Sequence, residues 1–492
     1  MKKIINLLTL IFLLAGFIFI SNSCSEEFFD TPTGNSIKPS NHYEYYIDAE
    51  LSYFGCFVFL QDLVDNLVLV NGLRSDIMDV TENADRDMID INNHVLTTTN
   101  PYLDPSVYYK IIINVNEVIP NLPGILEKDK DFDSTRLYAY TGALVTLRSW
   151  CYFVLARLNG EVGYIEGNLT EVDPSKPPKY YSKAEIIDIL IRDLIPYYDD
   201  DDIFRFAFDH LALLGELYLE KNDYAKAIRY FKKCIDGDGS PGYMVNTDYG
   251  TRNWGDIFIN SVSQFETVIT AVPFSYKDGQ PNILEVIFKD YYMVKPSSLI
   301  INAYNSQVPL TPEAEPGDIY RGEGITYDYN GSDEPVITKY SLEEGDGYSA
   351  DVCIYRDADI HLLLAEALNR NGDSENALVL LNLGMSQASN RPDAYARWSS
   401  NAGVRGRVSL QAVSASSVEA VEDLIIQERA LELAFEGKRW FDLVRIASRR
   451  NDPSYLANKV AAKFDDPAKA EQIRSKLMDT ENWYLPLSKI SE

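Results

Sequence analysis

The residue with the most specific chemistry in this chain is a cysteine close to the amino terminus. Cys24 follows an apolar stretch over residues 7–20, and two lysines, Lys2 and Lys3, precede that stretch. A basic start followed by an apolar segment is typical of a secretory signal peptide. Residues 21–23 are small and polar, which suits cleavage just before the cysteine. We therefore predict that the Cys24 thiol is lipidated and begins the mature protein.

This interpretation divides the start of the chain into a lipoprotein signal peptide, residues 1–23, and a lipidated tether, residues 24–41. The apolar stretch has 14 residues, fewer than the roughly 18 to 20 that span a bilayer. Two alternatives remain open, an ordinary cleaved signal peptide and a membrane anchor that ends near a cysteine. Ser21 stands where lipidation sites usually carry an aliphatic residue. If Cys24 is lipidated, the rest of the chain is tethered to a membrane outside the reducing cytoplasm.

A second constellation of reactive side chains lies near the carboxyl terminus. Arg429, Glu432, Glu436 and Arg439 are spaced three, four and three residues apart. A helix that continued through Gly437 would place all four on one face. Two glutamates one turn apart could act as general acid and base. Each glutamate, however, has an arginine three residues away, which favours ion pairs over a raised carboxyl pKa. The spacing therefore predicts a structural role.

Other catalytic and metal-binding patterns are absent from the sequence. It contains no H-E-x-x-H, G-x-S-x-G or P-loop motif. Asp129, Asp131 and Asp133 resemble the start of a calcium loop, but Ser134 replaces the required glycine and Tyr140 the final glutamate. We predict no catalytic residue, no metal ligand and no cofactor, and leave open a structural calcium ion elsewhere.

Composition narrows the class of protein. The chain has 492 residues, of which 46% are hydrophobic and 24% charged, as in globular proteins. Its net charge is −29, and loss of the two leader lysines would make it −31. Such a surface repels nucleic acid. Four scattered cysteines follow the tether without a C-x-x-C pair, so we interpret them as small buried residues and leave disulfides open. They are Cys56, Cys151, Cys234 and Cys353.

The elements that would position these residues are mainly helical. Two segments, near 210–235 and 359–385, place matching residues at offsets of zero, twelve, sixteen and nineteen. Those are the positions where the two helices of a tetratricopeptide-like hairpin pack closely. The matching residues are Gly215, Ala227, Phe231 and Cys234 in the first segment, and Ala365, Ala377, Leu381 and Gly384 in the second. The spacing predicts a mainly α fold built on helical hairpins.

Further helices are predicted over residues 106–119 and 138–158, the second ending at Asn159-Gly160. Between about 237 and 352 glycine, proline, aspartate and tyrosine become frequent, and strand-like pieces at 268–272 and 286–288 are short. We interpret residues 42–492 as a single domain in which this irregular region interrupts the hairpin scaffold.

The carboxyl-terminal segment resembles a known family. Its residues fit the signature E-R-x-x-E-L-x-x-E-G-x-R-W-x-D-L-x-R of SusD/RagB-type outer-membrane lipoproteins. Phe29-Asp30 with Pro32, residues 355–369 and residues 483–487 resemble further motifs of that family in the same order. The matching signature residues are Glu428, Arg429, Glu432, Leu433, Glu436, Gly437, Arg439, Trp440, Asp442, Leu443 and Arg445.

The resemblance implies a SusD-like α–α superhelix and a non-catalytic nutrient binder anchored by lipid to the outer membrane and exposed at the cell surface. Similar proteins cover a SusC-type TonB-dependent transporter and capture oligosaccharides, or in some members peptides. Their helical repeats contact the transporter, and the irregular part forms the ligand site. Glu26 and Glu27 resemble the export signal of surface lipoproteins.

Candidate ligand contacts are aromatic residues in loops with polar neighbours, because an aromatic face packs on sugar C–H groups while polar side chains bond the hydroxyls. The resemblance points to Tyr102. The irregular region contributes Tyr276, Tyr291, Tyr292, Tyr304, Tyr327 and Tyr329, and the candidate polar partners are Arg74, Asp76, Asn92 and Asn93. Besides glycan binding, three functions remain: a peptide-binding surface lipoprotein, a tetratricopeptide-type adaptor for proteins only, and an anchored hydrolase.

Overall fold

A computed structural model describes most of the chain after the predicted tether. It covers residues 42–165, 167, 178–198, 208–236, 257–258, 268–308, 317–318, 321–341, 348–382 and 414–487. The predicted signal peptide and tether, with Cys24, Glu26 and Glu27, lie outside the described residues. So do Gly384 and much of the predicted irregular region.

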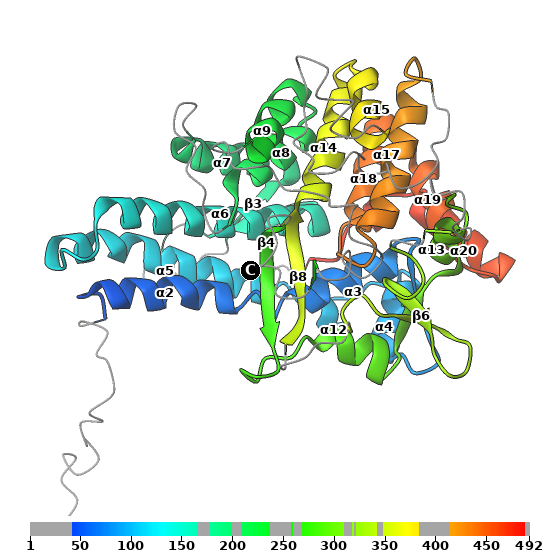
Figure 1. Ribbon diagram of the computed structural model, residues 1–492, viewed down its shortest axis with the longest axis horizontal. Coiled ribbons are helices and arrows are strands. Elements are labelled where there is room, and N and C mark those ends of the chain that lie inside the picture. The colour runs from blue at the N-terminus through cyan, green and yellow to red at the C-terminus, as the bar shows by residue number, and fades with distance from the viewer. Residues whose placement is uncertain are drawn as a thin grey trace, which may run out of the picture.

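Antiparallel helices form one side of the molecule (Figure 1). Helix α5 pairs with α6, α8 with α9, and α14 with α15, while α14 also packs against α9 and α17. Helix α2 (Tyr46–Val58) lies along α5 at the edge. The other helices of this side are α5 (Ser106–Lys128), α6 (Ser134–Asn159), α7 (Lys183–Leu194), α8 (His210–Glu220), α9 (Tyr224–Asp236), α14 (Asp357–Arg370), α15 (Ser374–Asn382), α17 (Val418–Glu432) and α18 (Arg439–Arg450).

The two predicted hairpins are α8–α9 and α14–α15, and they confirm the mainly α, tetratricopeptide-like scaffold. Gly215 permits the close approach in the first hairpin, since a Cβ atom there would lie 2.3 Å from the Phe231 ring. Ala227 is fully buried between the same helices. In the second hairpin Ala365 and Ala377 are equally buried. Small residues at these offsets are therefore a packing requirement.

The long helices differ from prediction in one respect. Helix α6 begins at an Asp133 cap and ends at Gly160, whose φ of 77° suits glycine. Helix α5, predicted to end before Pro120, instead continues to Lys128. Its buried apolar face extends past the prolines to Ile125, so tertiary packing offsets the hydrogen bonds that proline removes.

Short strands and helices form the other side of the molecule (Figure 1). Strand β4 pairs with β8 at the junction of the two sides, β1 pairs with β5, and β6 pairs with β7, all antiparallel. The elements are α3 (Val64–Arg74), β1 (Met78–Val80), α4 (Arg86–Asn92), η3 (Pro101–Leu103), β4 (Val268–Ser275), α12 (Ile283–Glu285), η5 (Val286–Asp290), β5 (Val294–Pro296), α13 (Ser298–Asn305), β6 (Tyr327–Tyr329), β7 (Pro335–Ile337), β8 (Tyr348–Arg356), α19 (Pro453–Ala461), α20 (Pro467–Leu477) and η6 (Thr480–Trp483).

Three smaller elements complete the fold. Strands β2 (Glu161–Tyr164) and β3 (Lys179–Ser182) pair beside α6, and η4 (Ile195–Tyr197) follows α7. The strand predicted at 268–272 is part of β4, but the one predicted at 286–288 is wrong. That segment is a turn of π-helix, η5, which follows α12 directly and buries Ile287 and Phe288.

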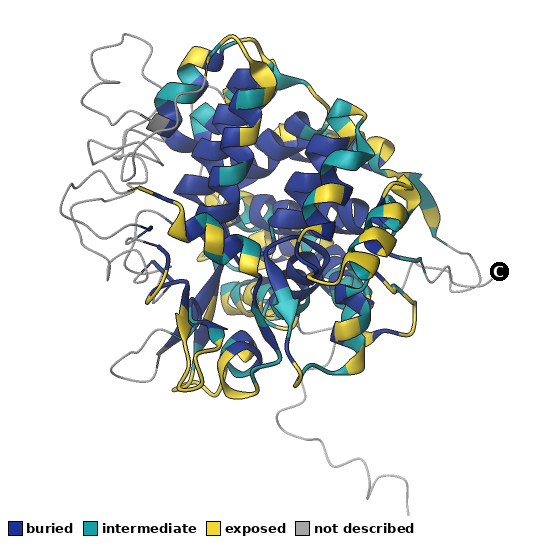
Figure 2. Ribbon diagram, turned by 90° about the vertical axis from the view of Figure 1, so that its right-hand side faces the viewer, coloured by how far each residue is buried: buried dark blue, intermediate teal, exposed yellow. Residues whose placement is uncertain are grey.

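One contiguous hydrophobic core joins both sides, as the buried interior in Figure 2 shows. It contains the four cysteines after the tether, all of them buried. The prediction that they are small buried residues is confirmed. Within the described residues we find no helix long and apolar enough to cross a membrane.

Candidate functional site

The charged residues near the carboxyl terminus do not form one helical face. Helix α17 ends at Glu432, and α18 begins at Arg439. Between them Phe435 and Gly437 adopt φ angles of 64° and 72°, which reverse the chain. The continuous helix considered from the spacing is therefore wrong. Glu432, Glu436 and Arg439 are nevertheless all buried.

Each buried glutamate pairs with cations that are distant in sequence. Glu432 binds Arg321 at 2.6 Å and Arg356 at 2.8 Å. Glu436 binds Lys339 at 2.5 Å and Arg356 at 2.9 Å. Burial alone would raise the pKa of Glu436, but Arg356 and Lys339 lower it below its ordinary value. A carboxylate held ionised by two cations is a poor proton donor, so the structural role predicted for these residues agrees with the geometry.

Three of the predicted polar ligand contacts belong to this interior. Arg439 binds Asp76 through two hydrogen bonds of 2.6 Å. Arg74 is fully buried, with its guanidinium 4.1 Å from the centre of the Trp440 ring. The guanidinium also donates to the Trp483 carbonyl. Arg74 and Asp76 therefore do not reach a ligand at the surface, because each is fixed inside the protein.

The prediction that Asn92 contacts a ligand is wrong for the same reason, because this residue is also fixed inside the protein. It is fully buried, accepts a hydrogen bond of 2.8 Å from Lys463 and donates one of 2.8 Å to Asp79. Burial lowers the pKa of Lys463 to about 7. Asn93, the next residue, is half-buried at the end of α4, with an enclosed side-chain oxygen that has no hydrogen-bond partner among the described residues.

Two of the predicted aromatic contacts are also interior. The Tyr304 hydroxyl donates to the Leu431 carbonyl at 2.6 Å, and the Tyr327 hydroxyl donates to Asn305 at 3.0 Å. Both side chains have no exposed surface. Burial raises the pKa of the Tyr304 hydroxyl strongly. These tyrosines support the loops and do not present a face to a ligand.

Four other predicted tyrosines lie at the surface of one region; we call Tyr102, Tyr291, Tyr292 and Tyr329 the tyrosine surface. Tyr291 is 63% exposed and Tyr329 is 39% exposed, whereas Tyr102 and Tyr292 are half-buried. They come from three separate segments: η3, the turn after η5, and β6.

Hydrogen bonds from the loop between β1 and α4 hold the first part of this surface. Asn83 donates to the Tyr291 carbonyl at 3.2 Å, and Thr81 donates to the Tyr292 carbonyl. Two residues further on, Asp85 caps α4 and accepts the Tyr102 hydroxyl at 2.8 Å. The loop thus connects η3 with the turn after η5.

The β6–β7 hairpin continues the surface. The Tyr292 hydroxyl lies 3.5 Å from Glu334, which precedes β7, while Tyr329 ends β6. Burial, Glu334 and Glu82 raise the pKa of Tyr292 to about 12. Aromatic faces therefore stand beside carboxylate and amide groups, the combination that can pack on a sugar ring and bond its hydroxyls.

Tyr276 lies at the margin of this region. It is 47% exposed, and its hydroxyl donates to Glu285 on α12. That hydrogen bond, burial and the nearby carboxylates of Glu285 and Asp290 raise its pKa to about 12. It lies in the turn that follows β4, whereas the four tyrosines come from η3, the turn after η5, and β6.

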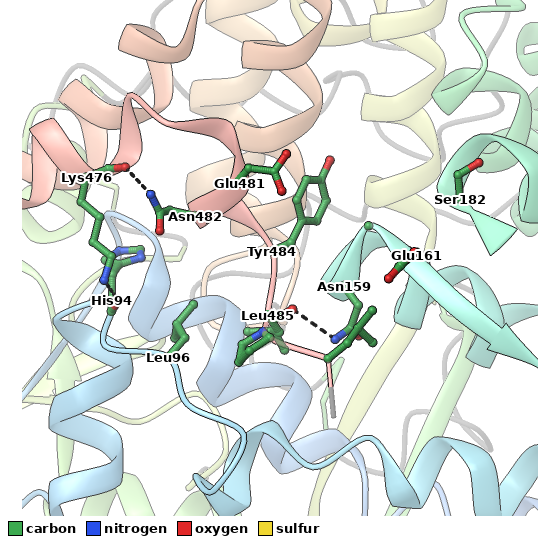
Figure 3. A pocket seen from close by; sticks show the side chains of 13 residues that line it. His94, Leu96, Asn159, Glu161, Ser182, Lys476, Glu481, Asn482, Tyr484 and Leu485 are labelled. Atoms are coloured by element: carbon green, nitrogen blue, oxygen red, sulfur yellow. Dashed lines mark hydrogen bonds between the residues drawn. The ribbon is translucent and has the colours of Figure 1, made fainter. Parts of the chain in front are cut away.

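A polar pocket of about 710 Å³ opens at the carboxyl-terminal segment (Figure 3). Its walls come from the end of α6 and from residues 481–487. These two segments are far apart in the sequence, and Asn159 donates a hydrogen bond of 3.5 Å to the Leu485 carbonyl, 326 positions away. The sequence marked Asn159-Gly160 as a helix end and residues 483–487 as a motif, but nothing in either segment indicated that they meet.

Several polar residues that line this pocket already form hydrogen bonds within the protein. Lys476 donates to the His94 carbonyl at 2.5 Å, and Asn482 donates to the Lys476 carbonyl at 2.9 Å. Ser182 forms a capping box with Glu185 at the start of α7. The pocket is therefore a seam that fixes the carboxyl-terminal segment, and the tyrosine surface is the better candidate for a ligand.

Two of the three aspartates that resemble a calcium loop, Asp129 and Asp133, accept backbone amides at the starts of α2 and α6. Asp129 accepts the Tyr46 and Asp131 amides at 2.9 Å each, and Asp133 accepts the Arg136 amide at the start of α6. Across the described part of the chain, no cluster of three or more His, Cys, Asp or Glu side chains could hold a metal ion.

Sequence and fold comparisons agree with this architecture. Residues 332–490 match the SusD family, and residues 211–238 match the tetratricopeptide repeat. SusD-like protein P38 from Formosa agariphila is 25% identical, over 90% of this chain and 92% of its own. A laminarin binding SusD-like protein shares the fold at 18% identity and a TM-score of 0.57, over 87% of this chain and 96% of its own. Surface glycan-binding protein A from Bacteroides uniformis shares the fold at 17% identity and a TM-score of 0.62, over 90% of this chain and 96% of its own.

Proposed function

We propose that this chain is a SusD-family protein that binds an oligosaccharide at the cell surface and delivers it to a SusC-type TonB-dependent transporter. The tyrosine surface carries the proposal, because exposed aromatic faces stand there beside Asn83, Asp85 and Glu334. Two solved structures with this fold are named for laminarin binding and for surface glycan binding.

The proposed role is binding without catalysis. The glutamate pair that could suggest acid–base chemistry, Glu432 and Glu436, is buried and bound to three cations. A glycoside hydrolase needs two carboxyl groups on either side of an accessible bond. This pair has no such access.

We further propose that lipid on Cys24 holds the protein in the outer membrane and that Glu26 and Glu27 direct it to the outer face. The net charge of −29 suits this placement, since a strongly acidic body stays away from anionic headgroups. The function needs no cofactor.

One alternative, capture of a peptide on the same scaffold, is favoured by a second cavity. It measures about 650 Å³ and is lined largely by apolar side chains, among them Ile113 of α5 and Val162 of β2, with Tyr109 and Tyr180. Cavities of this size and character suit ligands with apolar groups.

Calorimetry of the protein against a panel of glycans and peptides tests the proposal. With a glycan that binds, we expect Tyr291→Ala and Tyr329→Ala each to weaken binding about fivefold to tenfold, because each removes an aromatic face. Tyr138→Ala, on an exposed tyrosine of α6, serves as the matched control and should leave the affinity unchanged. Binding only to peptides, or equal affinity in all three variants, contradicts the proposal.

A further inference from the structure

The hydroxyl groups of the tyrosine surface are turned toward carboxylates of the protein. The Tyr102 hydroxyl donates to Asp85 at 2.8 Å. The Tyr292 hydroxyl donates to Glu334 at 3.5 Å, and the Tyr276 hydroxyl, at the margin of the region, donates to a carboxylate on α12. A tyrosine hydroxyl has one proton to donate, so these hydroxyls present only lone pairs to a ligand, as the carboxylates themselves do. A ligand that binds there must therefore supply hydrogen-bond donors.

The three segments around this surface are strongly acidic. Residues 79–90, 285–295 and 323–334 together contain 11 aspartates and glutamates but only three lysines and arginines, a net charge of −8. These 35 of the 492 residues therefore carry more than a quarter of the chain's net charge of −29. The segment 323–334, which includes the strands β6 and β7 in part, has no lysine or arginine at all.

The three cations of these segments each have an acidic neighbour. Arg86 of α4 lies 3.7 Å from Asp90, with its side chain 91% exposed. Lys295 of β5 is paired with Asp79 of β1 in the strand register. Lys289 of η5 is exposed, and an aspartate follows it directly. A carboxylate beside each cation reduces the positive potential that the cation offers to a ligand.

The pKa values of the tyrosine hydroxyls agree with this distribution of charge. Burial and a group of carboxylates that includes its partner Asp85 raise the pKa of Tyr102 above the ordinary value. The charged groups that raise the pKa of Tyr292 are likewise carboxylates. At Tyr164, on the helical side of the molecule, burial also raises the pKa, but Arg148 opposes the shift. The potential at the tyrosine surface is therefore negative.

We infer that the tyrosine surface selects uncharged oligosaccharides and rejects glycans that carry carboxylate or sulfate groups. This inference rests on the proposed function and adds the chemical class of its ligand. The hydroxyl groups of an uncharged sugar supply donors to the carboxylates and lone pairs, while its C–H groups pack on the aromatic faces. A uronate or sulfate group has only acceptors, and it would bring like charges together.

Calorimetry with matched forms of one glycan tests this class. The probes are laminarin, mannan and pullulan, each in its uncharged form and after chemical sulfation. For a glycan that binds, we expect the sulfated form to bind at least about tenfold more weakly at about 0.01 M salt, where the Debye length is about 30 Å. At about 1 M salt, where this length is about 3 Å, the difference should fall below about threefold, and the affinity of the uncharged form should stay the same.

A charge reversal separates electrostatic exclusion from the altered shape of a sulfated glycan. Glu82 and Asp290 are both exposed and lie in two of the three acidic segments. We expect Glu82→Lys/Asp290→Lys to reduce the ratio of uncharged to sulfated affinity at least about fivefold. The matched control, Glu127→Lys/Asp131→Lys, changes the net charge equally at exposed acids near the end of α5 and should keep the wild-type ratio. Thermal melting confirms folding, and Glu82→Gln/Asp290→Asn replaces the lysines if they prevent it.

The outcomes distinguish this inference from the proposed function. Weaker binding of the sulfated form, relieved both by salt and by the charge reversal, supports the inference. Equal or tighter binding of a sulfated form overturns it and leaves glycan binding intact. A difference that neither salt nor the charge reversal reduces also overturns it, because the shape of the glycan would then be the cause. Binding of neither form of any glycan overturns the inference together with the proposed function.

Discussion

Glu436 is a buried carboxylate whose two oxygens are both held by cations. One oxygen binds Lys339 at 2.5 Å and Arg356 at 2.9 Å, and the other binds Arg356 again at 2.9 Å. Burial lowers the pKa of Lys339 to about 8, although Glu436 opposes that shift. Such a group contributes little net stability as a pair, but the loss of one partner leaves charges buried without compensation.

We expect Glu436→Gln to lower the free energy of unfolding by about 3 to 5 kcal/mol at pH 7, because it leaves the buried Lys339 without a carboxylate and removes one of the two that Arg356 binds. The folded-state pKa of Glu436 is lowered, so its contribution is complete above its ordinary pKa and is lost as pH falls through the folded value. The difference between wild type and variant should therefore shrink below about pH 4. Urea denaturation between pH 7 and pH 3 measures it.

A surface pair provides the control for this prediction. Arg86 and Asp90 lie 3.7 Å apart, and the arginine side chain is 91% exposed. Arg86→Ala should change the unfolding free energy by less than about 1 kcal/mol. A Glu436→Gln protein as stable as wild type, or a difference that grows in acid, would show that the buried cluster does not depend on this charge.

At the scale of the elements, the close packing of the α8–α9 hairpin depends on glycine at position 215. We expect Gly215→Ala to destabilise the protein by about 1 to 3 kcal/mol, because the new Cβ would meet the Phe231 ring at 2.3 Å. The second change Phe231→Leu should recover part of that loss, so the double variant is more stable than the sum of the single effects. Urea denaturation of the three variants gives the coupling free energy.

Gly124 separates the clash from a general effect of replacing glycine. It lies in α5 with no atom within 4 Å of a Cβ position, so Gly124→Ala should be neutral or stabilise the protein by up to about 1 kcal/mol. If both alanines had the same effect, close packing would not explain Gly215.

Local patterns predicted the hairpins because they depend on residues close in sequence. Gly215 and Phe231 are sixteen positions apart and meet across one turn, so spacing alone identified them. The partners of Glu432 were not predictable in this way. Arg321 is 111 positions away, and the turn at Phe435 and Gly437 separates the residues that were expected to pair along one helix.

The same reasoning explains the outcome for the ligand candidates. Tyrosine type and loop position selected Tyr291 and Tyr329, which are exposed, together with Tyr304 and Tyr327, which are buried. The sequence does not distinguish the exposed pair from the buried pair. Tyrosine is common both in a core, where its hydroxyl finds a hydrogen-bond partner, and at a surface, where its ring is exposed. Arg74 was misplaced because its burial follows from a distant ring, Trp440.

At the scale of the whole molecule, the proposed mode of action requires the acidic body to remain at the membrane although its surface charge does not hold it there. The net charge is −29, and the described residues contain no helix that could cross the bilayer. Lipidation at a single cysteine predicts a simple dependence of location on that residue.

We expect Cys24→Ala to leave the protein without lipid and to shift it from the outer-membrane fraction to the released fraction, in cells that lack the transporter. Ser25→Ala, one position further along, should remain with the membrane and incorporate labelled palmitate as wild type does. Without the transporter present, contacts to it do not contribute, so the anchor is measured alone. A Cys24→Ala protein that still sediments with outer membranes would exclude lipid attachment at this cysteine as the means of anchoring. The proposed glycan contacts of the tyrosine surface do not depend on the anchor and would be unaffected.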